Sequence, residues 1–163
     1  RRAWLAFREA GDREFEAATT VLRSEVARNR SDRVGAWAAL PDAFAALPVL
    51  GPRRKVLAFH NAILTAEWFD QPGAARFLAD ALVDICLAEG DPLLAVAAYL
   101  RSAAARLALG RPAEARDLLA QAEALAPSIA DASLRDQYAT EVAVMATRAL
   151  AEVDPARAMQ AYD

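Results

Sequence analysis

Few residues of this 163-residue chain belong to the types that commonly act as nucleophiles or metal ligands. His60 is its only histidine and Cys86 its only cysteine. A histidine can activate a cysteine as a nucleophile where the two side chains meet. The two residues fall on adjacent predicted helices, which permits such a contact. Cys86, however, lies in the apolar run at residues 83–87, where a cysteine packs as a small hydrophobic side chain. We therefore favour a structural role for Cys86.

Sequence motifs of common active sites and metal centres are also missing. Tetrahedral zinc sites draw several Cys or His ligands at short spacings, and this chain has one of each. The sequence contains no glycine-rich phosphate loop, no Gly-x-Ser-x-Gly and no His-Glu-x-x-His. We therefore expect a protein that is not an enzyme, with no catalytic residues, no metal and no cofactor.

Two groups of basic residues offer a second kind of chemistry, the binding of an acidic partner or a nucleic acid. They are Arg28, Arg30 and Arg33, and residues 53–55. Basic side chains near helix ends also interact favourably with the helix dipole and keep the surface solvated. The net charge is −3, so the chain has no overall basic excess. We favour solvation and expect no nucleic-acid partner.

The composition indicates which elements must position these residues. Hydrophobic residues make up 56% of the chain and charged residues 25%, which excludes a disordered protein. Alanine, the strongest helix former, accounts for 43 residues, whereas aromatic residues make up only 7%. Charged residues interrupt every apolar stretch well before the roughly 20 residues of a membrane span. We therefore expect an all-α protein with no membrane association and a cytoplasmic location.

Helix-start signals recur with a period of 20 residues. Pro52, Pro72, Pro92 and Pro112 are equally spaced, and proline is well tolerated at the first position of a helix. The same spacing leads to the helix-capping residues Asp12 and Asp32 and to the vicinity of Asp131. Gly11, Gly51, Gly90 and Gly110 lie at the joins, where a helix end can use a left-handed residue.

This spacing predicts a string of about eight or nine helices. Their ranges are about 1–10, 13–29, 32–47, 53–69, 72–89, 92–109, 112–126, 131–152 and 155–163. Pro41 removes a backbone hydrogen bond inside the third range, so we expect a kink or split near Leu40. Pro48 and Pro52 should frame a loop.

Helices of similar length joined by short turns run antiparallel, so a helix pair recurs every 40 residues. Such a period is typical of a solenoid. The approximate repeats are 12–51, 52–91, 92–131 and 132–163. Both ends of the chain fall within predicted helices, so we expect residues 1–163 to be a single segment excised from a longer protein.

The helix that follows Gly110 resembles the second half of a tetratricopeptide repeat. Ala115 and Ala122 match the family's two small packing positions, Leu119 its large apolar position and Pro127 its terminal proline. The resemblance implies an antiparallel helix-pair solenoid whose first helices line a concave groove for partner peptides.

The preceding helix shows how the chain departs from this family. Tyr99 and Ala103 match the family's aromatic and small residues, but Ser102 and Arg106 replace its usual Leu and Tyr. The period is 40 residues, longer than the usual 34 or so. Divergent long repeats of this kind resemble the helical arms of large modular bacterial proteins, such as signalling ATPases and proteins with a caspase-like CHAT peptidase.

The resemblance also implies which residues contact a partner. The partner-binding residues would be Arg28, His60, Glu67, Trp68, Leu100, Leu107, Gln137, Thr140 and Arg148, with Thr20, Ser24, Ala104 and Thr147 at further groove positions. Solvation of an exposed face explains the polar members equally well. For Trp4, Trp37, Trp68 and Phe69 we favour packing between repeats, although an exposed Trp can anchor a bound peptide.

We therefore expect a non-enzymatic scaffold or sensor module that binds a protein or peptide, which could be another domain of the same parent chain. Two alternatives remain: a regulatory, autoinhibitory arm of a multidomain bacterial regulator or peptidase, and a module that senses a small molecule between its helices.

Overall fold

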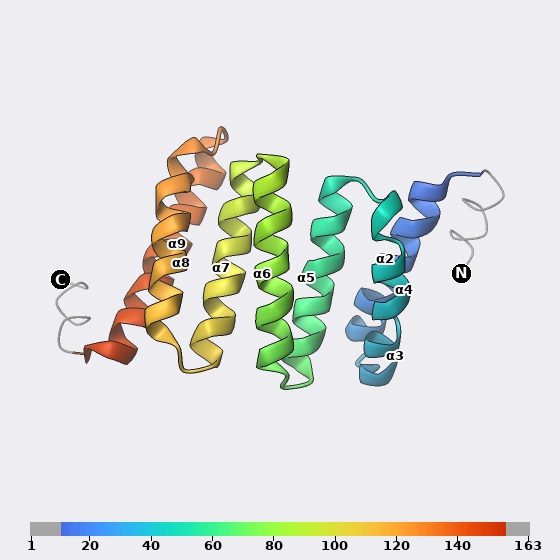
Figure 1. Cartoon of the computed structure of the whole chain (residues 1–163), viewed down its shortest axis with the longest axis horizontal. Helices are drawn as coiled ribbons and strands as arrows, with labels where there is room; N and C mark the ends of the chain where they lie inside the picture. Colours follow the sequence, from blue (N-terminus) through green and yellow to red (C-terminus); the bar gives the residue numbers. More distant parts are fainter. Residues whose placement is uncertain (1–10, 156–163) are drawn as a thin grey trace. The chain divides into compact units, whose positions relative to one another are not determined.

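The computed structural model describes residues 11–155, which form helices joined by short turns and contain no strand (Figure 1). The helices are α2 (Arg13–Asn29), α3 (Arg33–Ala38), α4 (Leu40–Ala45), η1 (Leu47–Val49), α5 (Pro52–Trp68), α6 (Pro72–Glu89), α7 (Pro92–Ala108), α8 (Pro112–Leu125), η2 (Ala126–Ser128) and α9 (Ala132–Val153). The expected all-α class is confirmed for these residues. The helix predicted at 1–10, the residues after Pro155 and Trp4 lie outside them.

The periodic prolines and aspartates begin the helices as the sequence predicts. Pro52, Pro72, Pro92 and Pro112 are each the first residue of a helix. Side chains of Asp12, Asp32, Asp91 and Asp131 cap α2, α3, α7 and α9 by accepting hydrogen bonds from backbone N–H groups of the first turn. Such caps satisfy donors that have no partner inside the helix.

The joins between helices use left-handed residues, only some of which are glycine. Gly11, Gly90 and Gly110 have φ values of 70°, 68° and 66°, as expected for glycine at a helix end. The prediction is wrong for Gly51, which is extended (φ −67°) and caps α5. Ser31 (φ 58°) and Asp70 (φ 54°) take the left-handed role at two further joins.

The predicted helix at 32–47 is divided into two short helices. α3 ends at Ala38 and α4 begins at Leu40, so the split lies where Pro41 predicts it. Beyond α4 the expected loop is partly ordered, because Pro48 and Val49 belong to the short helix η1. As a result, the described residues contain six helices of 14 to 22 residues, fewer long helices than the eight or nine predicted.

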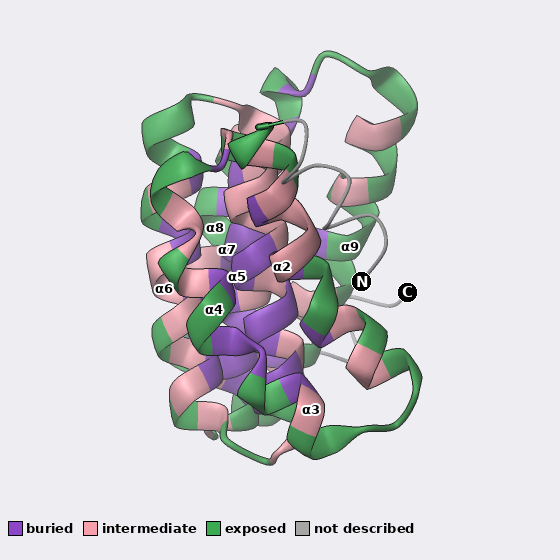
Figure 2. Cartoon of the chain, turned by 90° about the vertical axis from the view of Figure 1, so that its right-hand side faces the viewer, coloured by how far each residue is buried: buried purple, intermediate pink, exposed green. Residues whose placement is uncertain are grey.

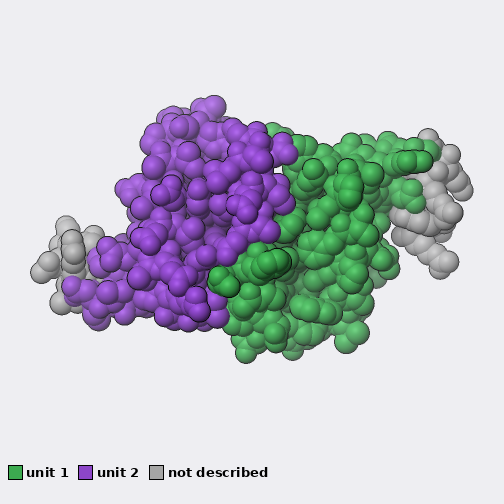
Figure 3. All heavy atoms as spheres, in the orientation of Figure 1, with its two compact units in different colours: residues 1–78 green, residues 79–163 purple. Residues whose placement is uncertain are grey.

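The chain divides into two compact units, residues 1–78 (unit 1) and residues 79–163 (unit 2), with the boundary inside α6 (Figure 3). In unit 1, α2 packs against α3, α4 and α5. Its core joins Ala17 and Val21 of α2 to Ala43, Leu50 and Ala58. Four of these five side chains are no larger than valine, which lets the helices approach closely.

In unit 2, α7 packs against α8, α8 packs against α9, and α7 also contacts α9. α7 is the most buried helix here, with nine of its 17 residues in the core (Figure 2). On α8, Ala115, Leu119 and Ala122 are buried, which confirms that the matched family positions are packing positions. Within residues 11–155, no helix combines the length and apolar character needed to cross a bilayer.

Candidate partner-binding surfaces

Arg28 is held within unit 1 by a contact between α2 and α5. Its guanidinium donates hydrogen bonds to the backbone oxygen of Asn61 (3.3 Å) and to Asn61 Oδ1 (3.2 Å). Asn61 is buried, and its backbone oxygen also accepts a bond from Thr65 Oγ1 (2.7 Å). Arg28 therefore joins the first helices of two successive pairs, which limits its freedom to bind a partner.

At the end of α5, the aromatic residues pack against α3 as expected. The Arg33 side chain donates to the backbone oxygen of Trp68, and its guanidinium lies 5.5 Å from the Trp68 ring centroid and 4.9 Å from that of Phe69. The Trp37 and Phe69 ring centroids are 5.1 Å apart. This cluster supports packing as the role of these rings, and it also occupies the basic side chain of Arg33. Glu67 beside it is exposed.

Two predicted groove residues of α7 belong to the core. Leu100 and Leu107 retain only 7% and 6% of their exposure. Apolar side chains in a helix of mostly buried residues gain more from this packing than from contact with a partner. The more accessible side of α7 carries Arg101, Ala104 and Ala108 instead, a shift of about one residue along the helix. His60 of α5 is half-buried.

A polar network lies where α7 departs from the family pattern. Asp80 of α6 pairs with both terminal nitrogens of Arg106, at 2.5 Å and 3.1 Å. The buried Ser102 hydroxyl donates to Asp80 Oδ1 (2.6 Å), and Arg106 Nη1 donates to Ser102 Oγ (2.7 Å). Glu114 of α8 approaches Arg106 Nε at 3.6 Å. The sequence signal was the replacement of two usually large side chains by Ser102 and Arg106, which we had not connected to Asp80.

The most open helix in the described part of the chain is α9. Only Val142 and Ala149 of its 22 residues are buried. Gln137, Glu141, Val144 and Arg148 follow one another at helical spacings of four, three and four residues, and all are exposed. We call these four residues the α9 stripe. Val144 is 57% exposed, and the helical pattern alone had not singled it out.

Interactions along the α9 stripe are local. Gln137 donates to Glu141 Oε1 (3.0 Å), and Arg148 pairs with Glu152 at 3.8 Å. The hydroxyl of the nearby Thr140 donates to a backbone oxygen one turn earlier. Exposed ion pairs of this kind contribute little to stability, so their side chains can exchange partners at low cost. Of the predicted partner-binding residues, Gln137, Thr140 and Arg148 are thus exposed together on one helix.

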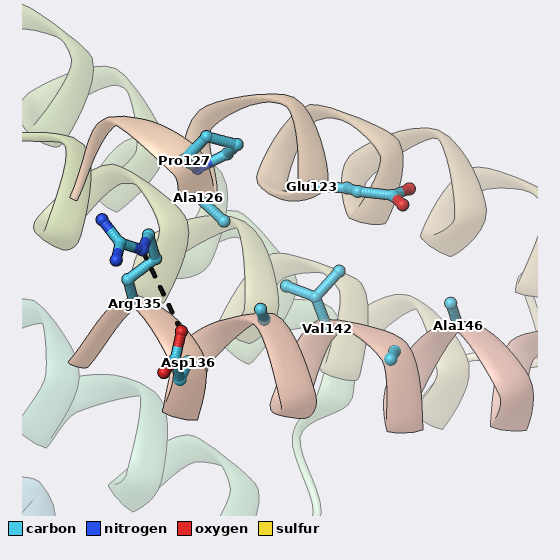
Figure 4. A pocket seen from close by; sticks show the side chains of 9 residues that line it. Glu123, Ala126, Pro127, Arg135, Asp136, Val142 and Ala146 are labelled. Carbon is cyan, nitrogen blue, oxygen red and sulfur yellow. Dashed lines mark ion pairs between the residues drawn. The ribbon is translucent and has the colours of Figure 1, made fainter. Parts of the chain in front are cut away.

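Beside α9 lies a hollow of about 380 Å³, bounded by α8, η2 and α9 (Figure 4). Its lining is mainly apolar and includes Ala126, Pro127 and Val142. Glu123, Arg135 and Asp136 supply its charged groups, and Arg135 Nε lies 4.0 Å from Asp136 Oδ1. An apolar hollow with a few charged groups suits either a protruding side chain or a small organic molecule.

Unit 1 contains a second hollow, of about 500 Å³, between α2 on one side and α4 and η1 on the other. Thr20 and Arg23 line it from α2, and Asp42 and Val49 line it from the opposite side. Arg23 Nη1 pairs with Asp42 Oδ2 at 3.0 Å across this surface. The division of α3 and α4 leaves no single long helix to cover this side of α2.

Reactive groups are few among the described residues. Cys86 is fully buried, and burial, with a smaller effect of Asp91 and Glu89, raises the pKa of its thiol to about 11. Such a thiol is almost entirely protonated near neutral pH and is a poor nucleophile. Between residues 11 and 155, no three His, Cys, Asp or Glu side chains gather in a group that could hold a metal ion.

Comparison of the chain with protein-family models, with curated proteins and with solved structures finds no match.

Proposed function

We propose that the chain is an array of stacked helix pairs related to tetratricopeptide repeats. Two features support this. In unit 1, the first helix α2 contacts the next first helix α5, and in unit 2, α7 likewise contacts α9. Left-handed joins also recur near every twentieth residue, at Gly11, Ser31, Asp70, Gly90 and Gly110. An array of this kind presents one long side of its first helices to solvent.

Its proposed function is to bind a partner polypeptide through the α9 stripe, without catalysis. The observation that carries this proposal is the exposure of α9: it is the longest described helix, and 20 of its 22 residues are not buried. The stripe combines an exposed apolar side chain, Val144, with the charged groups of Glu141 and Arg148. Interfaces commonly place an apolar anchor inside a polar rim in this way.

The test begins by finding what binds this surface. A photo-crosslinking amino acid at Val144 would capture the partner in cells, and the same amino acid at Arg116, on the exposed side of α8, would report non-specific capture. The purified partner is then titrated against the unmodified chain, against the double variant Val144→Arg/Arg148→Glu, and against Arg116→Glu as the matched charge reversal.

We expect the double variant to weaken binding by at least about tenfold, as substitution of central interface residues commonly does, and Arg116→Glu to change it less than about twofold. Equal affinities for all three proteins, with unchanged helical circular dichroism, would rule out the α9 stripe as the binding surface.

A second candidate function, small-molecule sensing, is supported by the hollow beside α9, whose volume of about 380 Å³ falls within the range of ligand pockets. A metabolite that fills it at a hundred times its Kd should stabilise the chain by about 2.7 kcal/mol, which a thermal-shift screen would detect. Val142→Trp should abolish that shift, because the indole would occupy the hollow. A shift that persists in this variant would place the ligand elsewhere.

A further inference from the structure

The hollow in unit 1 lies on a side of α2 that the other first helices cover with their preceding helix. The N-caps of α2, α5 and α7 are Asp12, Gly51 and Asp91, so these helices align with offsets of 39 and 40 residues. The pattern of burial agrees: Ala17, Val21 and Ser24 of α2 are buried, and so are their equivalents on α7, Val96, Leu100 and Ala103.

On α5, the residue equivalent to Thr20 contacts the helix that precedes α5. That residue is Phe59, which is 8% exposed. Its ring lies 5.5 Å from the ring of Phe44 on α4, at an interplanar angle of 72°. Edge-on aromatic contacts of this kind stabilise helix packing. The position therefore faces the preceding helix in the second pair.

On α7, the residue equivalent to Arg23 also contacts the preceding helix. That residue is Ser102, which is fully buried and donates to Asp80 of α6 at 2.6 Å. In α2, by contrast, Thr20 and Arg23 line the hollow of about 500 Å³. The same side of the first helix is thus packed against a preceding helix in two pairs and hollow in the third.

Residues 1–10 carry the side chains that such a preceding helix needs. They join α2 through Gly11 (φ 70°) and Asp12, as α6 joins α7 through Gly90 (φ 68°) and Asp91. With the same offset of 79 residues, the buried residues Leu82, Val83 and Cys86 of α6 correspond to Ala3, Trp4 and Phe7. The exposed Leu87 and Glu89 of α6 correspond to Arg8 and Ala10.

We propose that residues 1–10 pack as a helix against α2 and fill the hollow beside α4 with the side chains of Trp4 and Phe7. Ten helical residues span about 15 Å, which matches the distance along α2 from Arg13 to Arg23, the two ends of its lining of the hollow. The hollow is therefore a binding site for the chain's own first segment and is closed to other partners. This inference concerns unit 1 and is independent of the function proposed for α9.

Intramolecular cross-linking in the full chain tests the placement. Asp80 and Ser102, which touch in unit 2, correspond to Arg1 and Arg23. The double variant Arg1→Cys/Arg23→Cys should therefore form an internal cross-link with a short thiol-specific reagent. The matched control, Arg1→Cys/Arg30→Cys, moves the second thiol by seven residues, about 10 Å along the helix, and should react at least about fivefold less. Native Cys86 is buried and does not compete.

Thermal unfolding supplies a second measurement. Trp4→Ala/Phe7→Ala removes the two side chains placed in the hollow and should lower the Tm by at least about 5 °C. Leu5→Ala/Arg8→Ala changes two residues that correspond to exposed positions of α6, Asp84 and Leu87, and should change the Tm by less than about 1 °C.

Equal cross-linking of the two cysteine pairs, or equal Tm changes for the two alanine pairs, would overturn the proposal. Cross-links that join two chains would overturn it as well, since a second copy would then occupy the hollow.

Discussion

Replacement of Asp80 by alanine should destabilise unit 2 more than the loss of any other single ion pair among the described residues. Asp80 accepts both terminal nitrogens of Arg106 and the hydroxyl of Ser102. After the substitution, Arg106, whose side chain is only 12% exposed, would keep one carboxylate within reach, Glu114 at 3.6 Å. The buried Ser102 hydroxyl would lose its acceptor.

The magnitude follows from these exposures. Removal of one partner from a fully buried ion pair costs about 3–5 kcal/mol, because it leaves an uncompensated charge. The Asp80 side chain is 36% exposed and Glu114 remains near Arg106, so part of that cost is recovered through solvent and the second carboxylate. We expect Asp80→Ala to lower the free energy of unfolding by about 2 kcal/mol, which is roughly 4–8 °C in Tm for a chain of this length.

The opposite substitution should cost less. Arg106→Met keeps the aliphatic packing of the side chain and leaves Asp80 without its guanidinium partner. Asp80 can then be hydrated through its exposed third and still accepts from Ser102. We expect a loss of about 1 kcal/mol.

Urea denaturation followed by circular dichroism measures both values, with the free energy taken from the midpoint and slope of each curve. Arg23→Met and Asp42→Ala provide the matched controls, because that ion pair has similar geometry (3.0 Å) but side chains 63% and 60% exposed. Each control should change the free energy by less than about 0.5–1 kcal/mol. The reasoning fails if Arg106→Met costs as much as Asp80→Ala, or if Asp80→Ala costs no more than Asp42→Ala.

Three further predictions test other parts of the fold. Because burial raises the pKa of Cys86 from 9.0 to about 11, its neutral thiol favours the folded state below pH 9, and this contribution is lost as the pH rises to 11; urea midpoints should fall over that range, and less steeply in Cys86→Ala. Gly90→Ala forces a side chain into a left-handed conformation (φ 68°) and should lower the free energy of unfolding by about 1–2 kcal/mol, whereas Gly73→Ala, with no atom within 4 Å inside a helix, should raise it by about 0.5–1 kcal/mol; opposite signs in thermal unfolding are required. Asp131→Ala removes the hydrogen bond to the Leu134 N–H (3.0 Å) and should cost about 1 kcal/mol; an unchanged Tm would mean that α9 does not depend on its cap.

Local sequence determined the secondary structure with few errors. A proline or a capping aspartate acts through its own backbone and the next turn, so Pro52, Pro92 and Asp131 mark helix starts wherever the helices later pack. Pro41 likewise divided α3 from α4. Gly51 was misassigned because a glycine permits a left-handed backbone without requiring it.

The sides of the helices were harder to assign. Successive residues on a helix are about 100° apart, so an alignment error of one residue places a buried side chain on the predicted surface. This is how Leu100 and Leu107, both buried, were taken for groove residues. The α9 residues Gln137 and Arg148 remained exposed because little of that helix packs against its neighbours.

The sequence alone thus determined that the chain is helical, where most helices begin, and that Ala115 and Ala122 pack between helices. Only the tertiary structure decided which polar residues meet. Asp80 and Arg106 lie 26 residues apart on different helices, and their pairing depends on the register between those helices. The same holds for Arg28 and Asn61, 33 residues apart. Contacts between distant residues depend on how two helices are placed relative to each other, and helix starts and periodicity leave that placement open.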